Sequence, residues 1–154
     1  MDKAQASLLD RLIDADPANS RESVQYRLQS LSQVKVSLVR DIENLLNCRR
    51  SISPLPSGMH HLADSVAAYG LKDFTAENTS SQDVRRTIRK DVAHTITRFE
   101  PRLKNVKVAI ETGSQKERNL RFRISAMLVV DPIREPVTFD TYFDVIRKEY
   151  VVSS

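Results

Sequence analysis

The feature that most constrains this chain is a change of hydrophobic period at Glu100-Pro101-Arg102. Before this joint, apolar residues recur three or four positions apart, as they do along one face of a helix. After it, they recur at every second position, as they do along one face of a strand. Proline disfavours the helical conformation in the residue before it, so a helix entering the joint must end near Phe99. The sequence therefore predicts helices followed by strands.

Two main helices are predicted before the joint. Residues 22–48 carry apolar side chains at helical spacing, with Asn19 or Ser20 as a possible cap, and form an amphipathic core helix. Residues 81–99 form the second, because their apolar positions also follow the helical period: Val84, Ile88, Val92, Ile96 and Phe99. A loop over 51–58 and a short helix over 59–68 are expected between them.

Three strands are predicted after the joint, over residues 106–110, 120–130 and 137–145. Each alternates apolar with polar residues, and turn residues separate them. Such strands form an antiparallel meander with one apolar face, which the two helices would cover. The expected fold class is α+β, with two main helices packed on one face of a three-stranded antiparallel meander, in two layers.

The chain has 154 residues, a length that suits one domain. We expect that domain to span residues 21–154. Residues 1–20 hold a short apolar cluster, 7–13, that is too short to form an independent helix. This N-terminal segment is therefore predicted to be a docking segment, bound either to a partner or to the chain's own core.

The positive charge is concentrated in the middle of the chain. Residues 81–123 hold 12 Lys or Arg against 5 Asp or Glu, whereas the rest of the chain holds 12 against 15. A basic block of this kind can bind nucleic acid or an acidic protein surface. It can also be a solvated face of a helix and a strand. The sequence leaves these three interpretations open.

No motif for catalysis, a cofactor or a metal stands out. The chain has three glycines and no glycine-rich phosphate loop, and neither a cysteine nor a second carboxylate lies at ligand spacing from any of the three histidines. No apolar run is long enough to cross a membrane, and the first residues lack the pattern of a secretory signal. These patterns predict a cytoplasmic protein that is not an enzyme and has no cofactor, no metal and no inserted membrane segment.

The joint itself is the one local feature with a specific shape. Glu100 and Arg102 are held at the end of a helix and the start of a strand, and the planar fork of Arg102 suits carboxylates or backbone carbonyls. A preset charged corner loses little entropy when it docks on a partner. A local ion pair between Glu100 and Arg102 would explain the same residues.

The residues around the joint resemble the Glu-Pro-Arg motif of the TssE family, which is related to a wedge protein of contractile-phage baseplates. The helix running into Phe99-Glu100-Pro101-Arg102-Leu103, followed by Val106-Lys107-Val108, carries that motif. Three other stretches resemble segments of the family in the same order along the chain: 7–12, 37–49 and 65–74. At Cys48 the family more often has threonine.

The resemblance implies a structural subunit of the type VI secretion baseplate, which docks at the inner membrane. Its expected partners are the baseplate proteins TssF and TssG and the sheath proteins TssB and TssC, and its role is to seed the contractile sheath. Glu100, Pro101 and Arg102 are then the partner-binding residues. Arg102→Ala is expected to leave the monomer folded but to abolish sheath assembly.

Two alternatives make different predictions. A peptidoglycan-cleaving enzyme would use Glu100 as its general acid and would lose hydrolysis in Glu100→Gln. A basic nucleic-acid binder would show steeply salt-dependent affinity for DNA. The basic block has few aromatic residues among its arginines, so we expect no nucleic-acid partner.

Overall fold

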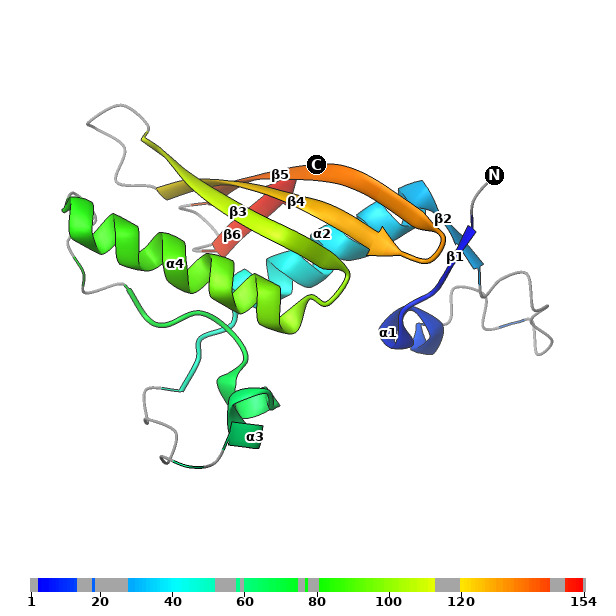
Figure 1. Ribbon diagram of the computed structural model, residues 1–154, viewed down its shortest axis with the longest axis horizontal. Helices are drawn as coiled ribbons and strands as arrows, with labels where there is room; N and C mark the ends of the chain where they lie inside the picture. The colour runs from blue at the N-terminus through cyan, green and yellow to red at the C-terminus, as the bar shows by residue number, and fades with distance from the viewer. Residues whose placement is uncertain are drawn as a thin grey trace.

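The computed structural model describes residues 3–13, 18, 28–51, 58, 60–74, 77, 81–112, 120–144 and 149–153. Figure 1 shows their elements along the chain, which are β1 (Lys3–Gln5), α1 (Leu8–Leu12), β2 (Leu28–Ser30), α2 (Leu31–Asn47), α3 (His60–Ala63), the 3₁₀ turn η2 (Val66–Ala68), α4 (Gln82–Phe99), β3 (Leu103–Thr112), β4 (Leu120–Val130), β5 (Ile133–Asp144) and β6 (Glu149–Ser153).

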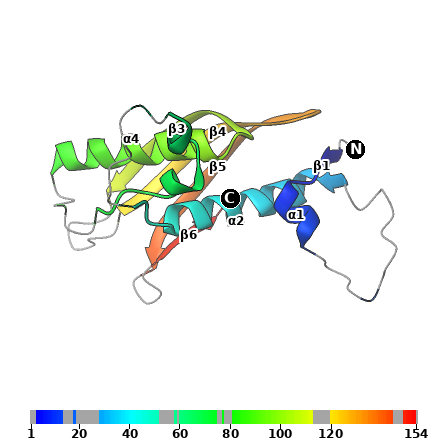
Figure 2. The same ribbon diagram turned by 90° about the horizontal axis from the view of Figure 1, so that it is seen from below.

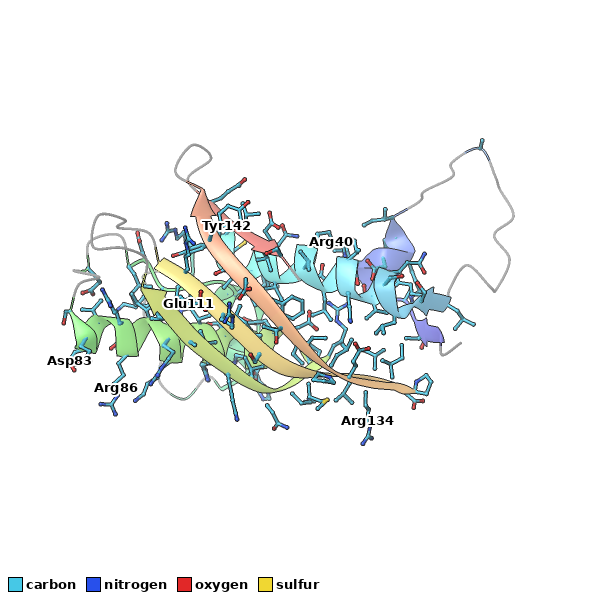
Figure 3. All side chains as sticks on the ribbon, turned by 90° about the horizontal axis from the view of Figure 1, so that it is seen from above. Arg40, Asp83, Arg86, Glu111, Arg134 and Tyr142 are labelled. Atoms are coloured by element: carbon cyan, nitrogen blue, oxygen red, sulfur yellow. The ribbon has the colours of Figure 1, made fainter. Side chains whose placement is uncertain are left out.

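The main sheet has the strand order β3-β4-β5-β6, and every neighbouring pair is antiparallel. Helices α2 and α4 cover one face of it. Figure 2 shows the sheet behind both helices, and Figure 3, from the opposite side, shows the sheet in front of them. The joint between α4 and β3 therefore connects the helical layer to the edge strand of the sheet.

The predicted fold class is wrong, because the architecture is larger than two helices on a three-stranded meander. The described residues form four α-helices, a four-stranded sheet and a second sheet of β1 and β2. Strand β6 was missed because its five residues do not alternate, since Tyr150, Val151 and Val152 are consecutive apolar residues. The β1–β2 sheet pairs three residues on each strand across a long sequence gap, which no local pattern reveals.

Helix α2 begins later than the sequence predicts. Its first residue is Leu31, and Ser30 is its N-cap. The Gln33 side chain accepts a hydrogen bond from the Ser30 backbone N–H at 2.8 Å, while the Gln33 N–H donates to Ser30 Oγ at 3.4 Å. This reciprocal capping box fixes the start of the helix. The earlier caps proposed at Asn19 and Ser20, and residues 22–27, lie outside the described residues.

One hydrophobic core joins the two main helices to the sheet. Its largest fully buried apolar side chains come from α2, α4, β3, β4 and β5: Leu38, Ile42, Ile88, Val92, Ile96, Leu103, Phe122, Ile124, Leu128 and Phe139. Burying side chains of this size contributes roughly 1.5–3 kcal/mol each. The core therefore fixes the angle at which α4 reaches the joint.

Strand β6 is attached to this core from two sides. The ring of Tyr150 lies 5.5 Å from that of Phe122, centroid to centroid. The Asn47 side chain, at the end of α2, donates to the Tyr150 carbonyl at 2.8 Å and accepts from the Tyr150 N–H at 2.7 Å. The Asn47 amide thus makes the pair of backbone bonds that a neighbouring strand would make.

A close backbone approach connects α2 to the segment before α4. Gly70 has a φ of +97°, and a Cβ at this position would lie 2.5 Å from the Cys48 carbonyl oxygen. Only glycine fits both the left-handed conformation and this space. Nearby, the Leu71 N–H donates to the Cys48 carbonyl at 2.9 Å and the Arg50 N–H donates to the Leu71 carbonyl at 2.8 Å. Cys48 itself is exposed.

Candidate functional site

The joint between α4 and β3 has the geometry that the change of period predicts. The Glu100 N–H donates the last helical bond to the Ile96 carbonyl at 2.9 Å, and Leu103 opens β3. Pro101 and Arg102 form the turn between them. The Val129 N–H donates to the Arg102 carbonyl at 2.8 Å, so β4 holds the turn in place.

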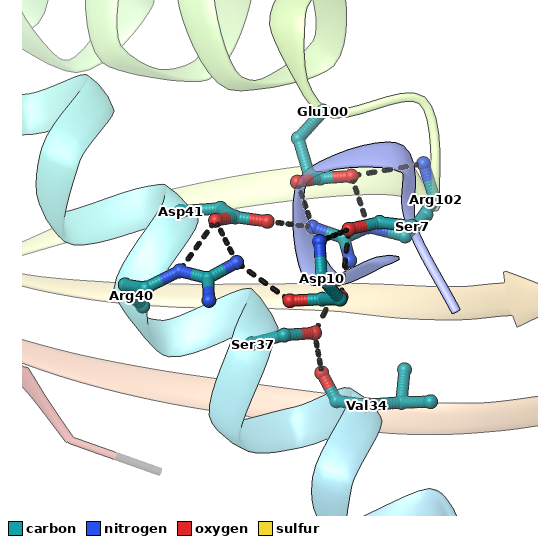
Figure 4. Close-up of polar contacts among 8 residues, drawn as sticks. All are labelled: Ser7, Asp10, Val34, Ser37, Arg40, Asp41, Glu100 and Arg102. Carbon is teal, nitrogen blue, oxygen red and sulfur yellow. Dashed lines mark hydrogen bonds and ion pairs between the residues drawn. The ribbon is translucent and has the colours of Figure 1, made fainter. Parts of the chain in front are cut away.

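Arg102 points inward, towards the acidic side chain of its own motif and towards α2 (Figure 4). Its Nε donates to Glu100 Oε1 at 2.7 Å, and one terminal nitrogen donates both to Glu100 Oε2 and to Asp41 Oδ2 at 2.6 Å. The side chains of Arg102, Glu100 and Asp41 are only 18%, 7% and 21% exposed. The bidentate contact with Glu100 is the fork geometry that makes such pairs strong.

The opposite charges in this cluster stabilise one another. Burial opposes the charge on Arg102, but hydrogen bonds and attraction from Glu100 and Asp41 outweigh burial and raise the pKa of the guanidinium. Asp41 also contacts a second arginine, since Arg40 donates to Asp41 Oδ1 through two nitrogens, at 3.0 and 2.9 Å. Two arginines and two carboxylates therefore alternate at the joint.

The same network extends to the N-terminal segment. Arg40 also donates to Asp10 Oδ1 at 2.8 Å, and Ser7 Oγ donates to Asp10 Oδ2 at 2.7 Å. Figure 4 shows the resulting series of contacts from Ser7 through Asp10, Arg40 and Asp41 to Arg102. Residues before α2 and residues after α4 are thus connected through side chains of α2.

The sequence indicated Glu100 and Arg102, the two joint residues that interact, but not the neighbours that they contact. Arg40 and Asp41 lie on α2, and Asp10 lies in α1. Their only sequence signal was that they occur in stretches that resemble conserved family segments. No spacing rule places residues 10, 41 and 102 together, because tertiary packing alone makes these contacts.

The Asp10–Arg40 ion pair makes stability dependent on pH. Burial raises the pKa of Asp10, but hydrogen bonds from Ser7 and Arg40 outweigh it, so the pKa lies below its ordinary 3.8. A lowered folded-state pKa stabilises the protein above 3.8, and this contribution is lost as pH falls through the folded-state value.

We therefore expect Asp10→Asn to lower the free energy of unfolding by up to about 1 kcal/mol at about pH 6, and by less at about pH 2. Urea unfolding of both proteins at the two pH values measures the difference. A penalty that is the same at both values would mean that the Asp10 charge contributes nothing to the fold.

A groove lies between the joint and the N-terminal segment. Its volume is about 1030 Å³, and Gln5, Leu9, Pro101, Asp131 and Pro132 are among the residues that line it. Pro101 and Pro132 are exposed. Glu100 and Arg102 line the groove as well, but their charged groups are engaged with each other. The joint thus presents Pro101 on a rigid support, and the assignment of all three residues to partner binding stays a prediction.

The N-terminal segment is attached to the chain's own body where the structure describes it. Strand β1 pairs with β2, and Ala4 is fully buried. Helix α1 nevertheless exposes Leu9, Leu12 and Ile13 by 48%, 73% and 52%. The division into a docking segment over 1–20 and a domain over 21–154 stays a prediction.

Within the described ranges, no group of three or more His, Cys, Asp or Glu is placed to hold a metal ion. None of the described helices is long and apolar enough to cross a membrane.

Comparisons with known proteins place this geometry in a family. A chain of a solved structure described as "The baseplate complex from the type VI secretion system" has a similar fold, with a TM-score of 0.50 and 16% sequence identity over 74% of this chain and 97% of that chain. A search of curated protein sequences finds no match. The family model described as baseplate wedge protein gp25 matches residues 32–133, which include α2, α4, the joint and β3 to the start of β5. The resemblance of the sequence to wedge proteins is thus confirmed, and the chain belongs to the gp25 family of baseplate wedge proteins.

Proposed function

We propose that this protein is the TssE-type structural subunit of a type VI secretion baseplate, and that it helps to nucleate the contractile sheath. Its partners would be TssF and TssG in the baseplate and TssB and TssC in the sheath, on the cytoplasmic side of the inner membrane. The observation that carries the proposal is the joint, where paired charges hold Pro101 beside a groove in a protein of the wedge family.

The arrangement suits a partner-binding surface for a physical reason. Glu100 and Arg102 form an ion pair with each other, so a partner that docks at Pro101 would leave neither charge unpaired. The proline also limits backbone freedom at the corner, which reduces the entropy lost on binding. We infer that Glu100 and Arg102 position the corner and that Pro101 and the groove contact the partner.

The same geometry argues against catalysis by Glu100. The Glu100 side chain is 7% exposed, and both of its oxygens accept hydrogen bonds from Arg102. A general acid must reach the glycosidic oxygen of its substrate within hydrogen-bond distance. A polysaccharide cannot reach this carboxylate without displacing Arg102. We therefore propose a non-enzymatic role.

The test changes the exposed corner and leaves the ion pairs intact. In cells that carry a fluorescent TssB, Pro101→Glu is expected to abolish sheath assembly, because it places an unpaired charge at the proposed contact. The purified variant should keep the thermal unfolding midpoint of the wild type to within about 3 °C, since Pro101 is exposed and surface changes cost little.

Pro136→Glu is the matched control. Pro136 is also exposed, but it lies in β5 and pairs with Met127 of β4. This variant is expected to form sheaths at the wild-type frequency. Normal sheaths in Pro101→Glu cells would remove the corner from the contact surface, and loss of sheaths in both variants would show a general effect of added charge.

A further inference from the structure

A second charged surface lies at the other end of α4. Arg86, Arg89 and Lys90 are exposed on the first half of this helix, and the half-buried Arg85 lies beside them. Residue pairs 85/89 and 86/90 are four positions apart, and 86/89 are three apart, so like charges are neighbours on the helix surface. Such pairs destabilise an isolated helix by a few tenths of a kcal/mol each.

The chain supplies few counter-charges here. Two other arginines near α4 do have carboxylate partners. Arg98 of α4 lies 2.8 Å from Asp64, and Arg50 lies 2.9 Å from Asp91 of α4. Among the residues that the structure describes, no carboxylate forms an ion pair with Arg86, Arg89 or Lys90. An excess of positive charge is therefore present on one helix face.

These arginines surround a hollow between α4 and the edge strand of the sheet. Its volume is about 420 Å³, and the described residues that line it are Gln82, Asp83, Arg85, Arg86, Arg89 and the β3 residue Ile110. Figure 3 shows Arg86 extending outward from α4. The hollow thus combines several guanidinium groups with one apolar side chain.

We propose that this hollow binds a carboxylate-rich segment of a partner protein. Each guanidinium presents a planar fork that matches a carboxylate, and Ile110 offers an apolar contact beside the charges. The surface is separate from the joint, because the part of α4 from Arg89 to Phe99, about 15 Å of helix, lies between them.

Nucleic acid fits this surface less well than an acidic peptide. Asp83 lies on the hollow and would repel a phosphate backbone, whereas an acidic protein segment can place a neutral or basic residue opposite it. Among the residues that the structure describes, no aromatic side chain lines the hollow, so unstacked bases have no platform there. The same lack of apolar anchors other than Ile110 disfavours insertion into a lipid surface.

Binding of a fluorescein-labelled peptide of alternating Glu and Ser, followed by anisotropy, tests the proposal. The full-length wild-type protein should bind the peptide, and the affinity should fall as salt screens the exposed charges. The double change Arg86→Glu with Arg89→Glu should weaken binding at least about tenfold, because it replaces two attractions by two repulsions. Arg86→Gln with Arg89→Gln, which only neutralises these charges, should give a smaller loss in the same direction.

The matched control is Arg11→Glu with Arg134→Glu, which makes the same change of net charge at exposed positions on α1 and β5. This control should change the affinity by less than about twofold. Equal losses in control and α4 variants would show that net charge alone attracts the peptide and would overturn the proposal. Tighter wild-type binding to a DNA duplex or to phosphatidylglycerol vesicles than to the peptide would also overturn it. These outcomes are independent of sheath assembly in Pro101→Glu cells.

Discussion

Replacing Arg102 with alanine is expected to lower the free energy of unfolding by about 3–5 kcal/mol. The change leaves Glu100, whose side chain is 7% exposed, without the cation that contacts both of its oxygens. Asp41 keeps Arg40 but loses its 2.6 Å contact with Arg102. A buried carboxylate without its partner is far more costly than a broken surface pair. Urea unfolding followed by circular dichroism at neutral pH measures the difference.

Arg49→Ala is the control for this prediction. It breaks an ion pair of similar length with Asp73, 2.9 Å, but both side chains are about half exposed, at 53% and 45%. The expected loss is at most about 0.5 kcal/mol. If Arg102→Ala were as mild as Arg49→Ala, the cluster at the joint would contribute nothing beyond a surface ion pair.

The buried cluster changes what Arg102→Ala can show about function. The sequence alone predicts that this variant folds normally and fails only in sheath assembly. With Arg102 turned inward, failed assembly could follow from a weakened fold as well as from a lost contact. The exposed Pro101, and not Arg102, therefore separates the two effects.

Phe122→Ala is expected to have an effect of similar size, about 3–5 kcal/mol, at the centre of the core. Phe122 is 1% exposed on β4, and its ring lies next to that of Tyr150 on β6. Removing it opens a cavity beneath the helices and takes away the aromatic contact that holds the last strand. We also expect the amides of β6 to exchange with deuterium faster than they do in the wild type, since Tyr150 loses its aromatic neighbour.

Tyr142→Ala provides the comparison for Phe122→Ala. Tyr142 also lies in the main sheet, on β5, but it is 47% exposed. Its removal should cost no more than about 0.5 kcal/mol. A loss below about 1.5 kcal/mol in Phe122→Ala would mean that the core collapses around the cavity and that the packing described here is easily rearranged.

The parts of the fold that the sequence predicted are those with a long and regular period. The second helix was placed over 81–99 and is found over Gln82–Phe99, because Pro101 ends it and its apolar residues repeat evenly. The long strand β4 was placed at its observed bounds for the same reason. The short strands β1, β2 and β6 were not predicted, since their pairing depends on distant partners and not on their own sequence.

The candidate site was predictable only as far as the backbone determines it. The proline fixes the corner, so the position of Glu100 and Arg102 followed from the sequence. Which way Arg102 turns could not follow, because an inward and an outward rotamer satisfy the same local backbone. Asp41 decides the direction, and its place beside Arg102 depends on how α2 packs against the sheet.

The amide of Asn47 makes the two edges of the main sheet unequal, because it occupies backbone groups of the edge strand β6. An incoming strand could form the outward bonds of Tyr150 on β6 only by displacing this side chain from both of them, and so would compete with the end of α2. A further strand joined to this sheet therefore meets an intramolecular competitor on the β6 side. Addition of a strand beside β6 thus carries a cost that a single asparagine side chain imposes, and this cost does not apply at β3, the other edge of the sheet.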